Sequence, residues 1–130
     1  MNAILDWLHK HRHRNTARIP VLICGLDYEH YRVQALVSRS RGYRVQALIN
    51  DFPWNHGTLV DEVRVYYPSE APSLVRRHGI AAILYCTQDD LALFDPDTAS
   101  TLRDLQVPFV RLAPDEVDDF DRFMMQRTGE

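Results

Sequence analysis

The stretch that most constrains the fold of this 130-residue chain runs from Ile19 to His30. It begins with a continuous apolar run, Ile19 to Cys24, and Gly25 follows that run directly. An unbroken apolar run is typical of a central strand covered on both faces, and a glycine at its end favours a tight turn into a helix. The stretch therefore predicts the opening of a βαβ unit, where such folds bind the phosphates of a dinucleotide.

The glycine pattern of that turn is incomplete. The dinucleotide-binding pattern Gly-x-Gly-x-x-Gly would place glycines at positions 25, 27 and 30, whereas the chain has Gly25, Asp27 and His30. A carboxylate at 27 would lie where a pyrophosphate approaches, and His30 replaces the glycine that lets helix and strand pack closely. We therefore expect weak binding of ordinary dinucleotides. Asp27 also has a structural interpretation, because its side chain can cap the following helix.

The rest of the chain alternates apolar runs with helical patterns. Further strands are predicted at 43–49, 61–67, 80–86 and 107–112, and helices at 27–41, 69–78 and 95–105, with a short helical turn at 88–94 and a last helix from 114. This order predicts an α/β protein, a three-layer Rossmann-like fold with a five-stranded parallel sheet in the order 3-2-1-4-5. Strands one and four are then neighbours, and ligands of such sheets bind beyond their carboxyl ends.

The charge distribution divides the chain into a basic N-terminal extension at 1–17, expected to be helical, and a single domain at 18–130. The extension is expected to be solvated; contact with an acidic lipid surface or an acidic partner is the alternative. The net charge of -3 gives no global basic field for nucleic acid. No apolar run approaches the roughly 20 residues of a membrane span. Cys24 and Cys86 both lie in expected buried strands, which favours reduced thiols and a cytoplasmic location.

Catalytic residue sets are hard to assemble from this composition. Lys10 is the only lysine, so the site cannot contain a Schiff-base lysine, a Walker lysine or the lysine of a Tyr-x-x-x-Lys pair. His30 and His56 are candidates for acid–base chemistry near the site, although a packing or surface role is expected for both. We therefore expect no catalytic activity, no catalytic residue and no metal site, and the sequence identifies no cofactor.

The candidate ligand site consists of the residues that follow strands one, two and four, since these loops converge in the expected sheet. Its members are Gly25, Leu26, Asp27, Tyr28, Asn50, Asp51, Thr87 and Gln88. Asp51 can bind a ribose hydroxyl or simply end its strand in a turn. Trp54 can stack on a ligand ring or a partner, or pack within its loop.

Four segments together resemble a known domain: Val21–Gly25, Gly42–Asp51, Arg77–Ile80 and Ala82–Tyr85. They are similar to the first Rossmann-like, CoA-binding-like domain of bacterial nucleotide-sugar dehydratases and epimerases of capsule and O-antigen synthesis. The similarity covers roughly Arg18 to Leu112, in order, spacing and apolar pattern. The resemblance implies a role in polysaccharide biosynthesis, with the phosphate loop at 25–30 and the acidic position after strand two at 50 or 51. The membrane helices and the catalytic domain usual in that family are not expected in this chain.

These observations predict a non-catalytic binding or regulatory module for a nucleotide, a nucleotide-sugar or a CoA-like ligand. The alternative is a protein–protein interaction domain with no small ligand, which includes a homodimer. A third hypothesis, a small nucleotide-sugar enzyme using His30, His56 and Asp51, has no motif behind it.

Overall fold

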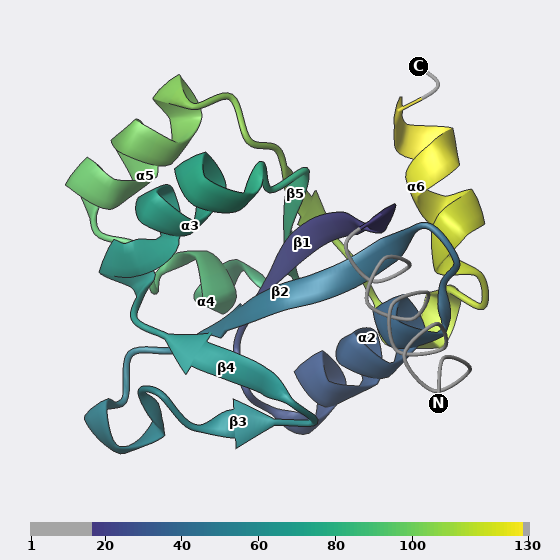
Figure 1. The fold of residues 1–130 in the computed structure, drawn as a ribbon, viewed down its shortest axis with the longest axis horizontal. Helices are drawn as coiled ribbons and strands as arrows, with labels where there is room; N and C mark the ends of the chain where they lie inside the picture. The colour runs from purple at the N-terminus through teal and green to yellow at the C-terminus, as the bar shows by residue number, and fades with distance from the viewer. Residues whose placement is uncertain (1–16, 129–130) are drawn as a thin grey trace, which may run out of the picture.

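In the computed structural model, residues 17–128 are described, and they form a six-stranded sheet between two layers of helices (Figure 1). The predicted basic extension falls almost wholly outside these residues. The strands are β1 (Ile19–Cys24), β2 (Tyr43–Ile49), β3 (Leu59–Val60), β4 (Val63–Tyr66), β5 (Ala82–Tyr85) and β6 (Phe109–Arg111). The helices are α2 (Tyr28–Arg39), α3 (Ala71–His78), α4 (Gln88–Leu91), α5 (Pro96–Asp104) and α6 (Phe120–Thr128), with short 3₁₀ turns at Pro53–Asn55, Pro68–Glu70 and Pro114–Glu116.

The sheet has the order β3-β4-β2-β1-β5-β6. Its last five strands are parallel to their neighbours, whereas β3 is antiparallel to β4. The predicted five-stranded, all-parallel sheet is therefore wrong at this edge. The reason lies at Asp61 and Glu62, which were expected to begin a strand but have φ values of 48° and 70°. Two consecutive residues with positive φ form the tight turn of a hairpin, so the chain folds back there and adds a strand.

The central strands are buried on both faces, as the unbroken apolar runs predict. Along β1, Val21 and Ile23 pack in the core cluster that contains side chains of α2 and α6. Leu22 and Cys24 pack in the opposite cluster, with side chains of α3 and α5. Figure 1 shows the same division, with α3 and α5 on one side of the sheet and α2 and α6 on the other. Within residues 17–128, no helix is both long and apolar enough to cross a membrane.

The ends of α2 and α3 differ from each other. Gly79 is the left-handed C-cap of α3, with φ 64°, as its position after the helix predicts. Gly42 is not the C-cap of α2, because the helix ends at Arg39 and Ser40 is its C-cap. The N–H of Gly42 instead donates to Asp121 Oδ1 over 2.9 Å, and a Cβ at position 42 would lie 3.0 Å from that oxygen. The glycine thus permits a close approach of the 114–121 segment.

The last predicted helix is divided in two. Pro114–Glu116 forms a 3₁₀ turn, and α6 begins only at Phe120. Asp119 Oδ1 accepts a hydrogen bond from the N–H of Arg122 at 3.1 Å, which starts the helix there. Val117, between the two helical pieces, packs against the core beside α2.

The two thiols lie on opposite faces of the sheet. Ile23 pairs with Leu84, so the same register places Cys24 beside Tyr85 rather than beside Cys86. Cys24 belongs to the α3–α5 core cluster and Cys86 to the α2–α6 cluster. Both are free and buried. The two apolar runs that end at these cysteines are therefore offset by one residue in the sheet, which places the two thiols on opposite faces.

Candidate functional site

The carboxyl ends of β1, β2 and β5 meet at one edge of the sheet. Cys24 pairs with Ile49, and the N–H of Gly25 donates to the Ile49 carbonyl oxygen at 2.9 Å. The chain runs from β1 outward to β2 on one side and to β5 on the other, so the strand order reverses here. The loops that leave this edge, together with the first residues of α2 and α4, contain all eight candidate residues.

The His30 side chain fills the glycine turn. Its ring is 2% exposed and lies against Gly25, whose φ is 122°. A Cβ at position 25 would come within 2.3 Å of His30 Cε1. Glycine at 25 is thus required both by the backbone conformation and by the ring. His30 stands at the third position of the dinucleotide-binding pattern, so an imidazole occupies space that the pattern keeps free of a side chain.

The hydrogen bonds of His30 fix its tautomer. The N–H of Asp27 donates to Nδ1 at 3.1 Å, so the ring carries its proton on Nε2. Nε2 in turn donates to Asp90 Oδ2 over 2.8 Å. The same carboxylate oxygen accepts from the N–H groups of Cys86, at 2.8 Å, and Thr87, at 3.1 Å. This His30–Asp90 bridge ties the loop after β1 to the loop after β5.

The N-terminus of α2 is already occupied by groups of the chain itself. Asp27 is the N-cap of α2 in a capping-box arrangement with His30, whose ring accepts from the Asp27 N–H. Glu29 adds a carboxylate in the first turn. A helix N-terminus ordinarily attracts phosphate, because its N–H groups are free and its dipole is positive. Here an imidazole and two carboxylates occupy the N-terminus of α2, so the turn has no binding site for a pyrophosphate.

The loop after β2 is shaped by Asn50. This side chain is 8% exposed, and its Oδ1 accepts from the N–H of Phe52 at 3.0 Å and from Asn55 Nδ2 at 3.1 Å. Asn50 therefore supports the loop instead of facing a ligand. Asp51 is exposed beside it. Phe52 and Trp54 stack with ring centroids 4.8 Å apart, and Trp54 is 73% exposed.

A second polar group lies in the neighbouring loops. The His56 ring stacks on Tyr67 at 4.1 Å between centroids, and His56 Nε2 lies 2.9 Å from Glu70 Oε2. Glu70 also accepts from the N–H of Tyr67 over 2.8 Å. Sequence reasoning named His56 but missed Glu70. Glu70 stands three residues after Tyr67, as in a capping box, but tyrosine is not an N-cap residue type, so no local pattern marks Glu70.

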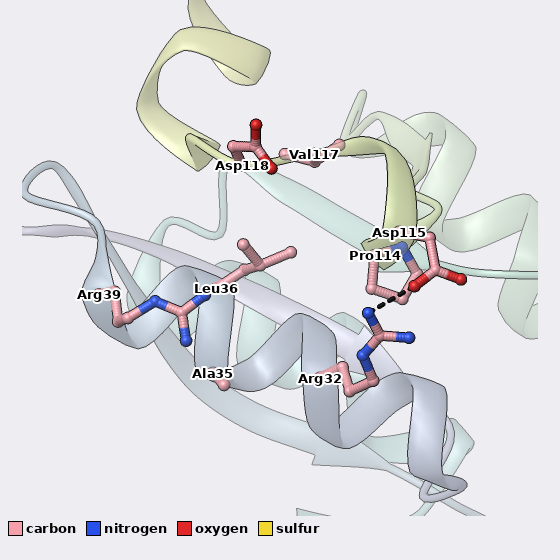
Figure 2. A pocket seen from close by; sticks show the side chains of 8 residues that line it. All are labelled: Arg32, Ala35, Leu36, Arg39, Pro114, Asp115, Val117 and Asp118. Carbon is pink, nitrogen blue, oxygen red and sulfur yellow. Dashed lines mark ion pairs between the residues drawn. The ribbon is translucent and has the colours of Figure 1, made fainter.

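Among residues 17–128, two larger hollows lie away from the predicted site and a small cavity lies under it. A small cavity of about 50 Å³ lies beneath the glycine turn, between Leu26, Gln34 and Val60. Ligand pockets typically measure about 300–1,000 Å³, so this space is too small for a nucleotide. Larger hollows of about 350 and 560 Å³ follow the far side of α2, against residues 114–121, and contain none of the eight candidates. Figure 2 shows the first of them, with the Arg32–Asp115 ion pair across one end.

Both thiols are poor nucleophiles at neutral pH. Burial raises the pKa of Cys24 well above its usual value, with Asp90 and Cys86 as further causes. Burial, then the carboxylates of Glu29 and Asp90, raise the pKa of Cys86 to about 12, and Arg111 opposes this shift. Thiols in this state do not act as catalytic thiolates.

No protein-family model matches the chain, and no curated protein matches it either. Several solved structures are similar in fold. The crystal structure of UDP-D-quinovosamine 4-dehydrogenase from Vibrio fischeri is 18% identical, with a TM-score of 0.60, and the similarity covers 85% of this chain and 87% of that one. The Rex-family repressor RSP is 16% identical, with a TM-score of 0.59, over 98% of this chain and 65% of that one.

A structure of RSP in complex with β-NADH is also similar, at 16% identity and a TM-score of 0.57, over 85% of this chain and 54% of that one. The chain thus spans somewhat less than two thirds of the repressor's length. Identities this low bear on architecture alone. These similarities and the sheet topology show that the chain has a Rossmann-like α/β fold.

Proposed function

We propose that this protein is a non-catalytic Rossmann-like binding module whose ligand contains a nucleoside, as in a nucleotide or a nucleotide-sugar. The observation that carries the proposal is the exposed group Asp51, Phe52 and Trp54 at the carboxyl end of β2, beside the point where the strand order reverses. A base stacks on the aromatic rings, and Asp51 accepts a hydrogen bond from a ribose hydroxyl.

The phosphates of the ligand lie outside the glycine turn in this proposal. The His30–Asp90 bridge and the Asp27 cap fill the turn, so the nucleoside supplies most of the binding free energy. The similar structures support a nucleotide ligand, because one is named for a UDP-sugar and another contains NADH. The polysaccharide setting implied by the resemblance makes UDP-sugars the first ligands to test.

The proposal that the module is non-catalytic is supported by the side chains at the carboxyl edge of the sheet. The chain's only lysine is Lys10, which lies far from the candidate loops in sequence. The Cys86 thiol is protonated, since its pKa is about 12. His30 is buried with both ring nitrogens in hydrogen bonds, so neither nitrogen is free to exchange a proton with a substrate.

Calorimetric titration of the full chain with uridine, UDP, a UDP-sugar, adenosine and NADH tests the proposal. Uridine and its nucleotides should bind with similar affinity, in a range of about micromolar to millimolar, or roughly -8 to -4 kcal/mol, whereas NADH should bind no tighter than about millimolar. Trp54→Ala should weaken binding about 5- to 150-fold, because one stacked base contributes about 1–3 kcal/mol. Leu59→Ala, an apolar truncation at an exposed side chain outside the ring pair, should leave the affinity unchanged. Turnover of a UDP-sugar, or no nucleoside binding at millimolar concentration, would refute it.

The second candidate is an interaction domain without a small ligand, and the same exposed rings favour it. Phe52 is 49% and Trp54 73% exposed, and the two rings stack into one apolar surface, the kind of surface that partners contact. Sedimentation at several concentrations separates the two candidates. Self-association that Trp54→Ala abolishes, together with no nucleoside binding, would favour the interaction domain.

A further inference from the structure

Three metal-type donors converge beside the His30–Asp90 bridge. Glu29, His30 and Cys86 each offer one ligand atom, and these atoms all lie within 4.8 Å of one another. His30 is 2% and Cys86 5% exposed, and Glu29 is half-buried. Glu29 and His30 lie in the first turn of α2, and Cys86 lies in the loop after β5. The bridge joins these two segments, so the proximity of the donors is built into the fold.

The charge around these donors is unbalanced. Within residues 17–128, the Glu29 carboxylate and the Cys86 thiol have no hydrogen-bond or ion-pair partner. Burial is the largest cause of the raised pKa of Cys86, the carboxylates of Glu29 and Asp90 add to it, and Arg111 opposes it. Two carboxylates thus act on a buried sulfur atom that has one cation against them. A divalent cation would reverse this charge balance and stabilise the thiolate.

The His30 imidazole has a carboxylate partner on one ring nitrogen, as metal-ligating imidazoles usually do. Asp90 accepts a hydrogen bond from Nε2, and a carboxylate on one ring nitrogen fixes the orientation of the other. An ion at Nδ1 would displace the Asp27 N–H and keep this arrangement. An ion at Nε2 would replace the ring proton and bring the Asp90 carboxylate within reach of the metal. Either position costs the ring one hydrogen bond.

We propose that Glu29, His30 and Cys86 bind a zinc-type divalent ion with one coordination position open. Thiolate, imidazole and carboxylate are the ligands that zinc takes in proteins, and three protein ligands with an open fourth position are a known zinc arrangement. Ligand atoms in tetrahedral zinc sites lie about 3.3–3.8 Å apart, so the donors need to close by about 1 Å. Binding releases the thiol proton, so the affinity rises with pH. The site is independent of any nucleoside ligand.

Cobalt titration of the full chain tests the site, because a cobalt–thiolate bond gives a charge-transfer absorption in the near ultraviolet. We expect this band to saturate at one equivalent of Co²⁺ and to disappear when Zn²⁺ is added. His9, His11 and His13 lie outside the described residues and can also bind cobalt, but they supply no thiolate. The triple variant H9Q/H11Q/H13Q should therefore keep the band.

The two cysteines provide a matched control. Cys86→Ser should abolish the band, whereas Cys24→Ser, at an equally buried thiol outside the cluster, should retain it. Glu29→Gln should weaken cobalt binding at least about 10-fold. Because Glu29 is half-buried, this variant should fold even if Cys86→Ser does not, and it then serves as the second test. The proposal is wrong if the wild-type chain gives no thiolate band at millimolar cobalt. It is also wrong if folded Cys86→Ser keeps the band, or if Glu29→Gln binds cobalt as the wild type does.

Discussion

Truncating Asp90 should be among the most destabilising single substitutions at the carboxyl edge of the sheet. One oxygen of this carboxylate accepts three hydrogen bonds, from His30 Nε2 and from the N–H groups of Cys86 and Thr87. Asp90→Ala leaves the buried donors of His30 and Cys86 without a partner, and each such donor costs about 1–3 kcal/mol. Water can reach Thr87, which is exposed. The two donors together give about 2–6 kcal/mol, and we expect a loss of unfolding free energy near the middle of that range, about 3–5 kcal/mol.

Urea unfolding followed by circular dichroism measures this loss. With an m-value of about 1–3 kcal/mol/M, the midpoint should fall by roughly 1–5 M. Asp89→Ala is the matched control, because Asp89 lies in the same first turn of α4 and is exposed. Asp90→Asn should give an intermediate loss, since it keeps an acceptor but not the charge. A loss for Asp90→Ala within about 1 kcal/mol of that for Asp89→Ala would show that the bridge contributes little.

Three further predictions follow from the glycine turn and the thiols. Gly25→Ala should destabilise the protein more than Gly79→Ala in thermal unfolding, because its Cβ would lie 2.3 Å from the His30 ring, whereas no atom lies within 4 Å at position 79. Equal losses would contradict this packing. In calorimetry, Asp27→Gly alone should leave NAD binding weaker than about millimolar, or -4 kcal/mol, and a gain in NAD affinity should require His30→Gly as well. Micromolar NAD binding by the unchanged protein would refute the view that these side chains block the glycine turn. The folded pKa of Cys86, about 12, exceeds the unfolded value of about 8.5, so stability is full below pH ~8.5 and declines as pH rises toward 12. Urea midpoints between neutral and alkaline pH should decline less in Cys86→Ser, and an unchanged decline would contradict the shift.

The centre of the sheet was predictable because its strands are buried on both faces. The unbroken apolar runs ending at Cys24 and Cys86 mark β1 and β5, because a strand buried on both faces is apolar at successive positions. The edge hairpin was not predictable in the same way. Asp61 is a turn-forming residue type but Glu62 is not, so the turn lacks the Asn-Gly or Asp-Gly pair that marks a hairpin in sequence.

The candidate site was predictable in position but not in role. The loops after β1, β2 and β5 converge as topology requires, yet Asn50 supports its own loop and His30 fills the glycine turn. Asp90 was not named at all, because its partner His30 lies 60 residues away and the contact depends on how two loops meet. Side-chain roles of this kind come from tertiary packing, which a local pattern does not contain.

The β3–β4 hairpin also has a consequence for association through sheet extension. β3 is only two residues long, and its turn carries the two carboxylates of Asp61 and Glu62. The side-chain amide of Gln34 donates to the Val60 carbonyl oxygen at 2.9 Å, so a helix already occupies one acceptor of this strand. Short, charged and partly covered edge strands resist pairing with another chain. Any polymer or dimer built by continuing the sheet would therefore have to grow from β6, at the opposite edge.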